Sequence, residues 1–436
     1  MKIAILGYGL EGVATLNYFN QSENSITICD QNPDLEKVSG INYQLGQDYL
    51  TNLDKFDLIV RSPGLNPALI FDNNTGIDKS KITSGTNIFF QMSPTKNIIG
   101  VTGTKGKGTT STLIHKMLIE IGKKSYLAGN IGIPALNLLG RVSADDFIVL
   151  EMSSFQLSDC NYSPHIAVCL MITQDHLDWH GQIESYIDSK RNIVKHQTEN
   201  DIVIYHALND KSKSLAETSL ANRVPYLETP GAIIQNQHIV IEDQIICAVS
   251  EVGLLGRHNL ENICAAVTCI WQISKSKDAI ARVIKNFTGL KNRLEFIREK
   301  NGIRYYNDSF ASAPDAAIAG MKAITKPKVL IVGGFDRNLD LKSLSESIIS
   351  EDKNGLVKKL ILIGASAARL AKELDGQNYA NYEITNAKNM TEVVELATNY
   401  ASEGDAVLLS PGFASFDMFK NFEERGKAFE EAVNNL

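Results

Sequence analysis

The feature that most constrains the fold is a regular alternation of short apolar runs with segments of helical periodicity. The apolar runs include "KIAIL", "SITICD", "FIVLE", "IAVCLMIT" and "KVLIVGG", which are hydrophobic at nearly every position. Such runs are typical of parallel strands that are buried on both faces, because a solvent-facing side would produce a polar residue at every second position. Strand and helix signals that follow each other in this way predict a doubly wound α/β fold.

The chain is too long for one hydrophobic core. Its 436 residues correspond to about three domains, because a domain usually contains about 100–200 residues. The polar segment "QMSPTKN" and Gly289, which follows a helical pattern, provide the breaks. We therefore predict domains at residues 1–90, 91–289 and 290–436. Residues from about 215 to 252 alternate without helical periodicity, which predicts a small antiparallel sheet.

Charge and cysteine content exclude several classes of protein. The formal net charge of −7 gives no overall attraction to nucleic acid or to an anionic membrane. Six scattered cysteines without a Cys-x-x-Cys pair predict reduced, mostly buried thiols rather than a disulfide framework or a zinc site. The sequence enters a strand pattern at its start, and no apolar run is long enough to cross a bilayer. We therefore expect a cytoplasmic protein without nucleic acid or membrane partners.

The segment "GTKGKGTT" lies between the apolar run "NIIGVTG" and a helical pattern. Glycines let backbone N–H groups surround a phosphate, and the amino terminus of the helix adds partial positive charge. In the general motif G-x-x-x-x-G-K-[ST], the lysine reaches the β- and γ-phosphates and the hydroxyl binds Mg²⁺. This loop has Val101 and Gly108 where the motif has glycine and a hydroxyl residue, so Thr109 is the expected hydroxyl ligand. A flexible glycine turn is the alternative, but the order of strand, glycines, lysine, hydroxyls and helix favours a nucleotide site.

A second glycine loop, "GYGLEG", follows the first predicted strand. Gly7, Gly9 and Gly12 fit the pattern G-x-G-x-x-G, and Asp30 ends the next strand, where an acid often binds a ribose. By itself this loop indicates either a dinucleotide-binding protein or a tight turn with close helix packing. The chain therefore offers two sites of the size of a diphosphate.

Segments along the whole chain resemble the signature segments of the Mur ligase family. In order they are "GTKGKGTT", "GNIGIPAL", "EMSSFQL", "QDHLDWHG", "GRHNLENICAA", "GLKNRLEF", "YNDSFAS" and "LLSPGFASFDMFKNFEERGKAF". Two of them, "EMSSFQL" and the last, are similar to the branch that adds D-glutamate to UDP-N-acetylmuramoyl-L-alanine. The resemblance implies an N-terminal Rossmann-like domain, a central P-loop ATPase domain with a parallel sheet and a C-terminal Rossmann-like domain. It also implies a monomer that uses ATP and two Mg²⁺ ions and forms an acyl phosphate.

The resemblance implies roles for individual residues. The catalytic group comprises Lys107, His176 and Lys190, and the metal group comprises Thr109, Glu151, His176 and Lys190, with the lysine carbamylated. The nucleotide contacts are Gly103, Thr104, Lys105, Gly106, Lys107, Gly108, Thr109, Thr110, Asn259, Asn262, Arg293 and Asp308. The substrate contacts are Gly7, Gly9, Leu10, Glu11, Gly12, Asp30, Ser62, Pro63, Gly64, Asn130, Ser153, Gln156, Ser312, Arg337, Ser415 and Phe422.

Without the resemblance, simpler interpretations apply to several of these residues. Glu151 is a strand-end acid, His176 an isolated histidine, and Lys190 a solvated helix lysine. Where many family members have "DSKAT" this chain has "DSFAS", so Phe310 replaces a lysine, and Arg337 stands where the family has another lysine. Four alternatives therefore stay open at this point: a folylpolyglutamate synthase, which shares "GTKGKG", a family member that adds another amino acid, an NAD(P)-binding protein, and a regulatory ATP-binding module without ligase activity.

Overall fold

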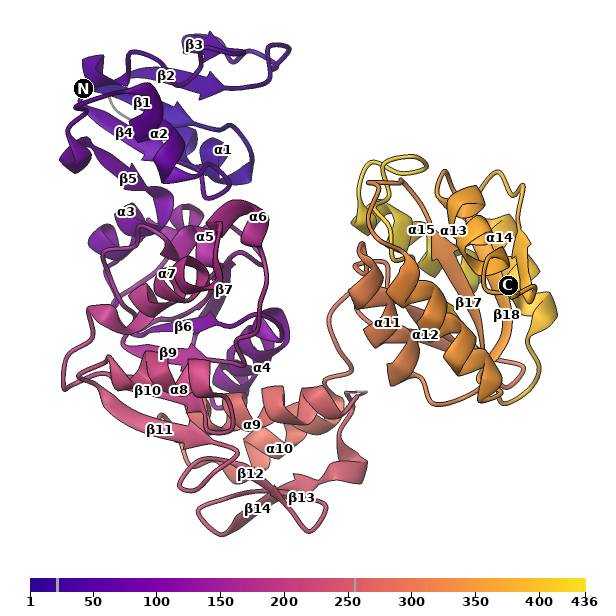
Figure 1. The fold of residues 1–436 in the computed structure, drawn as a ribbon. Helices are drawn as coiled ribbons and strands as arrows, with labels where there is room; N and C mark the ends of the chain where they lie inside the picture. Colours follow the sequence, from indigo (N-terminus) through magenta and orange to yellow (C-terminus); the bar gives the residue numbers. More distant parts are fainter. Residues whose placement is uncertain (21–22, 255) are drawn as a thin grey trace. The chain divides into compact units, whose positions relative to one another are not determined.

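Four β-sheets organise the part of the chain that the computed structural model describes, which is residues 1–20, 23–254 and 256–436 (Figure 1). Three of the sheets are parallel or almost entirely parallel, as the buried apolar runs predict. Two compact units hold these sheets: residues 1–251 with 258–285, and residues 252–257 with 286–436. The α/β class is therefore confirmed, whereas the domain boundaries after residues 90 and 289 stay predictions.

The first sheet of the first unit has the strand order β3-β2-β1-β4-β5, and all its neighbouring strands are parallel. Its strands are β1 (Lys2–Leu6), β2 (Ser25–Asp30), β3 (Asn42–Leu45), β4 (Leu58–Arg61) and β5 (Ile82–Ser84). The helices that accompany it are α1 (Leu10–Phe19), α2 (Pro67–Asn73) and α3 (Gly85–Met92).

The second sheet of this unit is also parallel, with the order β11-β10-β9-β6-β8-β7. Its strands are β6 (Ile98–Thr102), β7 (Ser125–Gly129), β8 (Phe147–Glu151), β9 (Ile166–Cys169), β10 (Ile202–His206) and β11 (Asn222–Tyr226). The helices between its strands are α4 (Lys107–Glu120), α5 (Ser154–Leu157), α6 (Leu177–His180), α7 (Ile183–Lys195) and α8 (Asp210–Glu217). Because β6, β8 and β9 are adjacent and parallel, the segments that follow them meet at one edge of the sheet.

The predicted antiparallel sheet is confirmed. It has three strands, β12 (Ile233–Gln235), β13 (His238–Ile241) and β14 (Gln244–Ala248). Two helices, α9 (Arg257–Trp271) and α10 (Lys277–Asn286), follow it in the chain.

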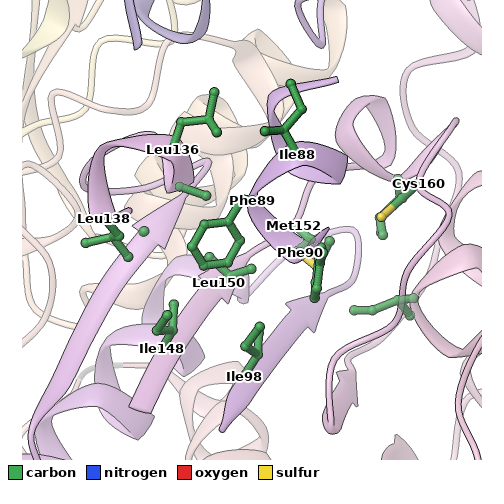
Figure 2. Close-up of a cluster of buried hydrophobic side chains, with 14 of the residues drawn as sticks. Ile88, Phe89, Phe90, Ile98, Leu136, Leu138, Ile148, Leu150, Met152 and Cys160 are labelled. Atoms are coloured by element: carbon green, nitrogen blue, oxygen red, sulfur yellow. The ribbon is translucent and has the colours of Figure 1, made fainter. Parts of the chain in front are cut away.

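One hydrophobic core joins the two parallel sheets of the first unit. Helix α3 begins in the residue range of the first predicted domain and ends at Met92, and its Phe89 and Phe90 point into the same cluster as Ile98 of β6 and Leu150 of β8 (Figure 2). The short 3₁₀ helix Ala135–Leu138 completes this cluster (Figure 2). The two sheets therefore form one compact unit, although the sequence pattern breaks after residue 90.

The second unit contains a sheet with the order β15-β16-β20-β17-β18-β19, in which only the β15–β16 pair is antiparallel among the described strands. Its strands are β15 (Glu295–Lys300), β16 (Ile303–Asn307), β17 (Lys328–Gly333), β18 (Val357–Ile363), β19 (Tyr382–Ile384) and β20 (Ala406–Leu409). Its helices are α11 (Pro314–Ala323), α12 (Lys342–Lys353), α13 (Ala367–Asp375), α14 (Met390–Tyr400) and α15 (Phe422–Asn435). Alternate residues of β17 belong to two separate cores, so this strand is buried on both faces.

Two predictions from composition have structural counterparts. All six cysteines are buried free thiols. None of the helices in the described residues combines the length and the apolar character that a bilayer crossing requires.

Candidate active site

The loop between β6 and α4 forms the candidate phosphate site. Gly106, with φ of +87°, precedes the first residue of α4, and a Cβ at this position would lie 2.1 Å from the side-chain oxygen of Asn262. Lys107 begins the helix, and its Nζ donates to the carbonyl oxygens of Gly103 and Thr104 at 3.1 and 3.0 Å. The glycine therefore allows the loop to approach α9 closely, while the lysine folds back over the loop.

The hydroxyl residues after Lys107 differ in their surroundings. Thr109 is half-buried, whereas Thr110 is buried and its Oγ1 has no hydrogen-bond partner among the described residues. Lys105 is exposed and Gly108 is buried. The buried hydroxyls of Ser111 and Thr112 also have no partner among the described residues, so this property does not single out Thr110 as a ligand contact.

Glu151 ends β8 directly beside the phosphate loop. In the sheet it is opposite Val101, which lies one residue before the end of β6. The carboxylate is buried, and its Oε1 accepts a hydrogen bond from Asn130 Nδ2 at 2.8 Å. Its Oε2 has no hydrogen-bond partner in the described part of the chain. A buried carboxylate oxygen without a partner is costly, so this group fits a hard cation such as Mg²⁺.

Lys190 of α7 is buried against the same loop. Its Nζ donates to the Gly103 carbonyl oxygen at 2.9 Å and lies 3.4 Å from the hydroxyl of Thr102, while the ring of Tyr186 is 4.6 Å from it. Burial is the main reason why the pKa of Lys190 lies well below its usual value, and the nearby positive charge of Lys107 lowers this pKa further. This lysine is therefore not a solvated helix residue, and its ammonium form is disfavoured relative to that of an exposed lysine.

His176 lies at the start of α6, with φ of +52°, and its ring is exposed. Its ring centroid is 4.8 Å from that of Phe155 of α5, and its Nε2 is 3.8 Å from Asp175. Within the described residues no group of three or more His, Cys, Asp or Glu residues is arranged to hold a metal ion. The predicted metal group contains only two residues of those types, so its assembly around an ion stays a prediction.

Ser153 and Gln156 form a capping box at the start of α5. The Ser153 hydroxyl accepts from the Gln156 backbone N–H at 3.2 Å, and Gln156 Oε1 accepts from the Ser153 backbone N–H at 3.1 Å. Gln156 also donates to Glu11 Oε1 of α1 at 3.2 Å. These two residues therefore have a structural role in addition to the substrate contacts predicted for them.

A pocket of about 610 Å³ opens at the ends of β1, β2 and β4. Of the residues predicted to contact substrate, Gly7, Gly9, Asp30, Ser62 and Gly64 line it. Sequence reasoning missed further lining residues, namely Tyr8, Gln31, Tyr49, Leu65, Asn66, Ala68, Leu69, Asp178 and Trp179.

Other residues of the predicted substrate group lie elsewhere. Leu10 is largely exposed, and Glu11 is turned toward Gln156. Gly12 is buried in α1, where a Cβ would lie 2.2 Å from the Gly7 carbonyl oxygen. In the described part of the chain, the pocket lining includes neither Pro63 nor any of these three residues.

Asp30 has a structural role in the pocket, because its Oδ2 accepts a hydrogen bond from the backbone N–H of Tyr8 at 2.7 Å. Asp178 and Trp179 come from the segment after β9. The only signal for them in the sequence is their proximity to His176 in "QDHLDWHG".

On α9 the two predicted nucleotide contacts are buried and bonded to each other. Asn262 Nδ2 donates to Asn259 Oδ1 at 3.0 Å. This leaves the side-chain oxygen of Asn262 beside Gly106 of the phosphate loop.

The second unit carries the remaining predicted residues. The guanidinium of Arg293 lies 3.6 Å from the ring centroid of Phe310, and Phe310 packs edge-on against Phe422 at 5.1 Å. The residue that replaces the family's lysine therefore stacks on a guanidinium. Arg337 Nη2 donates to the Ser312 carbonyl oxygen at 2.7 Å.

Three polar residues in this part of the second unit are buried, namely Asp308, Ser415 and Arg425. Burial raises the pKa of Asp308 to about 7, against the opposing effect of a hydrogen bond from Ser410. Sequence reasoning missed Arg425, which is buried and donates to the carbonyl oxygens of Phe413 and Ala414, both at 3.1 Å.

A strand that leads into a lysine-bearing phosphate loop, next to a strand that ends in a buried acid, is suited to phosphoryl transfer. This arrangement is typical of enzymes that bind the phosphates of a nucleotide. Two family models narrow the class: the Mur ligase middle domain matches residues 101–270, and the Mur ligase, glutamate ligase domain matches residues 292–413. The chain belongs to the Mur ligase family, whose members are ATP-dependent ligases.

Similar proteins cover the whole chain. The UDP-N-acetylmuramoylalanine–D-glutamate ligase of Acetivibrio thermocellus is 36% identical over 460 residues, with 100% of this chain and 96% of the relative covered. The protein of the same name in Clostridium novyi is 34% identical over 454 residues, with 100% and 97% covered. Among solved structures, the MurF ligase from Thermotoga maritima in complex with ADP has a TM-score of 0.61 at 17% identity, covering 99% of this chain and 94% of that one.

The UDP-N-acetylmuramate–alanine ligase MurC of Thermotoga maritima gives a TM-score of 0.60 at 14% identity, with 100% of this chain and 99% of that one covered. At these identities the solved structures support the fold alone.

Proposed function

We propose that this chain joins the carboxyl group of UDP-N-acetylmuramoyl-L-alanine to the amine of D-glutamate, with ATP as the energy source. The observation that carries this proposal is the similarity over the full chain to relatives that are named as the D-glutamate ligase. The product is a precursor of peptidoglycan. The pocket at the first sheet also supports the proposal, because a folylpolyglutamate synthase does not require a site for a UDP-linked substrate.

The proposed reaction must first activate the carboxylate of the UDP-linked substrate. A carboxylate is a poor electrophile, so one of its oxygens first attacks the γ-phosphorus of ATP and ADP leaves, which gives an acyl phosphate. The D-glutamate amine then attacks the acyl carbon, loses a proton, and displaces inorganic phosphate from the tetrahedral intermediate. Phosphoryl transfer depends mainly on positioning and on charge neutralisation. In this chain Lys107 and the amino terminus of α4 supply positive charge where the γ-phosphate is expected.

Thr109, Glu151, His176 and Lys190 are the residues that would hold Mg²⁺, and we propose two ions. When bound, Mg²⁺ neutralises the charge that develops on the transferred phosphoryl group. The unpaired Glu151 Oε2 fits this role. Lys190 fits a carbamylated ligand, because its neutral amine can attack CO₂ to give a carbamate and one proton, and the carbamate then presents anionic oxygens.

Each substrate has its own group of residues in this proposal. The UDP-linked substrate binds in the pocket lined by Gly7, Asp30 and Ser62. Asn259 and Asn262 of the first unit contact ATP, and Arg293 and Asp308 remain predicted nucleotide contacts. The D-glutamate carboxylates are bound in the second unit by Ser312, Arg337, Ser415 and the backbone at Phe422. Arg337 can bind a carboxylate through two parallel hydrogen bonds, which the lysine common in the family cannot do.

Release of ADP and phosphate tests the proposal directly. The purified chain is mixed with UDP-N-acetylmuramoyl-L-alanine, D-glutamate, ATP and Mg²⁺, and the product is identified by mass spectrometry. Omitting any one component should abolish phosphate release, and a panel of other amino acids, L-glutamate included, should be inactive. Lys107→Ala should lose activity while Lys105→Ala, an exposed lysine in the same loop, should lose less.

Two outcomes would overturn the proposal. Turnover with a folate and L-glutamate would support a folylpolyglutamate synthase, and turnover of a nicotinamide cofactor would support a redox protein. We also propose that the enzyme works as a monomer in the cytoplasm, and sedimentation velocity of the purified chain tests the first of these two statements.

A further inference from the structure

Arg61, the last residue of β4, is a buried cation to which neither the sequence motifs nor the proposed reaction assigns a role. Its side chain has no exposed surface. Its Nε and Nη2 donate to the two carboxylate oxygens of Asp159 at 2.8 and 2.6 Å. A buried ion pair is stable only when its remaining donors are also bonded, and here each guanidinium nitrogen has at least one acceptor.

The remaining donors of Arg61 bind the pocket loop, which we define as Ser62–Leu65. Nη1 donates to the carbonyl oxygens of Ser62, Pro63 and Leu65 at 3.1, 3.0 and 2.8 Å. The fourth carbonyl oxygen of the loop, that of Gly64, accepts from Trp179 Nε1 at 3.0 Å. Every carbonyl group of the pocket loop therefore has a donor.

This matters because the pocket loop lines the site proposed for a UDP-linked substrate. Ser62, Gly64 and Leu65 contribute to the wall of the 610 Å³ pocket, but Arg61 does not reach it. Carbonyl oxygens that faced the pocket would repel the two negative charges of a diphosphate. Arg61 turns three of them toward the protein interior, so the wall can accept an anion.

Arg61 also connects the pocket loop to the segment that follows Glu151. Its Nη2 donates to the Phe155 carbonyl oxygen at 3.1 Å and to the Ser158 hydroxyl at 3.2 Å, at α5 and the residue after it. Helix α5 begins three residues after Glu151. One guanidinium therefore links the wall of the substrate pocket to the strand end that carries the proposed metal ligand.

We propose that Arg61 is a positioning residue for the UDP-linked substrate, and that Asp159 maintains the orientation of its guanidinium. Arg61 shapes the pocket loop from within and holds it against α5, without touching the substrate. Lysine cannot replace it, because an ammonium group lacks the planar set of five donors that these acceptors require. The identity of the substrate rests on the function proposed above, whereas the link between Arg61 and the pocket rests on the geometry of the first unit.

Binding measurements on folded variants test this inference. The dissociation constants of UDP-N-acetylmuramoyl-L-alanine and ATP are measured by calorimetry for the wild type, Arg61→Lys and Asp159→Asn, together with the KM for D-glutamate. Loss of charge-assisted hydrogen bonds predicts that the UDP-linked substrate binds about 10- to 100-fold more weakly to Arg61→Lys and less severely so to Asp159→Asn. ATP binding and the KM for D-glutamate should stay within about twofold of the wild type, because their proposed contacts lie elsewhere.

Lys328→Met is the matched control, because Lys328 is also fully buried and pairs with Glu351 at 2.8 Å in the second unit. This variant should lower the melting temperature without weakening UDP-substrate binding. Trp179→Phe is a milder variant, because it deletes the indole donor to the Gly64 carbonyl oxygen and retains an aromatic ring at the pocket wall. It should weaken binding of the UDP-linked substrate by about fivefold through the pocket wall, and Asp159→Asn keeps the role of Arg61 testable if Arg61→Lys does not fold.

The outcomes separate the two proposals. A wild type that does not bind the UDP-linked substrate overturns the proposed function. A wild type that binds it, together with an Asp159→Asn variant that binds it equally well, overturns the role of Arg61. A lower melting temperature with unchanged affinity in Arg61→Lys would likewise reduce Arg61 to a structural ion pair.

Discussion

Replacing Gly106 with alanine should lower both the stability of the protein and its affinity for ATP, whereas the same change at Gly122 should lower only the stability. Gly106 has φ of +87° and precedes α4, and Gly122, with φ of +80°, follows the same helix. A Cβ at Gly106 would lie 2.1 Å from Asn262 Oδ1, whereas a Cβ at Gly122 has no atom within 4 Å. The two glycines therefore share the backbone requirement but differ in the space around them.

The magnitudes follow from this difference. A left-handed conformation costs an alanine about 1–2 kcal/mol, part of which is offset because alanine also restricts the unfolded chain. Gly122→Ala should therefore lose about 1 kcal/mol of stability. Gly106→Ala must in addition displace Asn262 from its hydrogen bond to Asn259, which costs about 1–3 kcal/mol more because both groups are buried. The asparagine pair also contacts ATP in the proposed site, so ATP should bind at least about 10-fold more weakly.

Thermal unfolding and calorimetric titration with ATP check these values. Gly106→Ala should have the lower melting temperature and the weaker ATP binding, and Gly122→Ala should bind ATP as the wild type does. If Gly106→Ala lost no more stability than Gly122→Ala and retained its ATP affinity, the close approach between the phosphate loop and α9 would have no functional role.

Three further predictions concern buried or stacked groups. Wild-type protein under ¹³C-labelled CO₂ should show a carbamate carbon resonance that is absent from Lys190→Arg, because a guanidinium does not supply the neutral amine; a resonance that persists in the variant would exclude this lysine. The pKa of Asp308 rises from 3.8 to about 7 on folding, so the native state holds a proton that the unfolded state has released, and stability should fall by up to about 4 kcal/mol between pH 4 and 7. Unfolding followed across this range should show a flatter pH dependence in Asp308→Asn, and an unchanged slope would contradict the assignment. Phe310→Leu should remove about 1 kcal/mol of cation–π stabilisation from Arg293 and lower the free energy of unfolding by that amount, while Phe310→Tyr retains the ring and the stability; equal free energies of unfolding in the two variants would argue against the stack.

The sequence predicts the features that depend only on residues close together in the chain, such as single strands and the phosphate loop. The run "KVLIVG" predicts a strand buried on both faces, and β17 is such a strand because its alternate side chains enter two different cores. The order of strand, glycine loop, lysine and helix around Lys107 is also local, so the sequence alone is enough to predict the phosphate loop.

Packing determined which distant groups share a site. On sequence alone Lys190 is a helix lysine, and only the contact of α7 with the phosphate loop buries it. The break after residue 90 is visible in the sequence, but α3 crosses it in space and joins the two sheets through Phe89 and Phe90 (Figure 2).

The contacts of Arg61 are the clearest example of contacts that the sequence alone does not predict. Its carboxylate partner is 98 positions away, and the tryptophan that completes the pocket loop is 115 positions from Gly64. The chain's periodicity and turn residues specify strands, helices and a phosphate loop, because those depend on backbone preferences over a few residues. The partner of a buried charge depends on which parallel strands become neighbours in the sheets, and no short stretch of the chain contains that information.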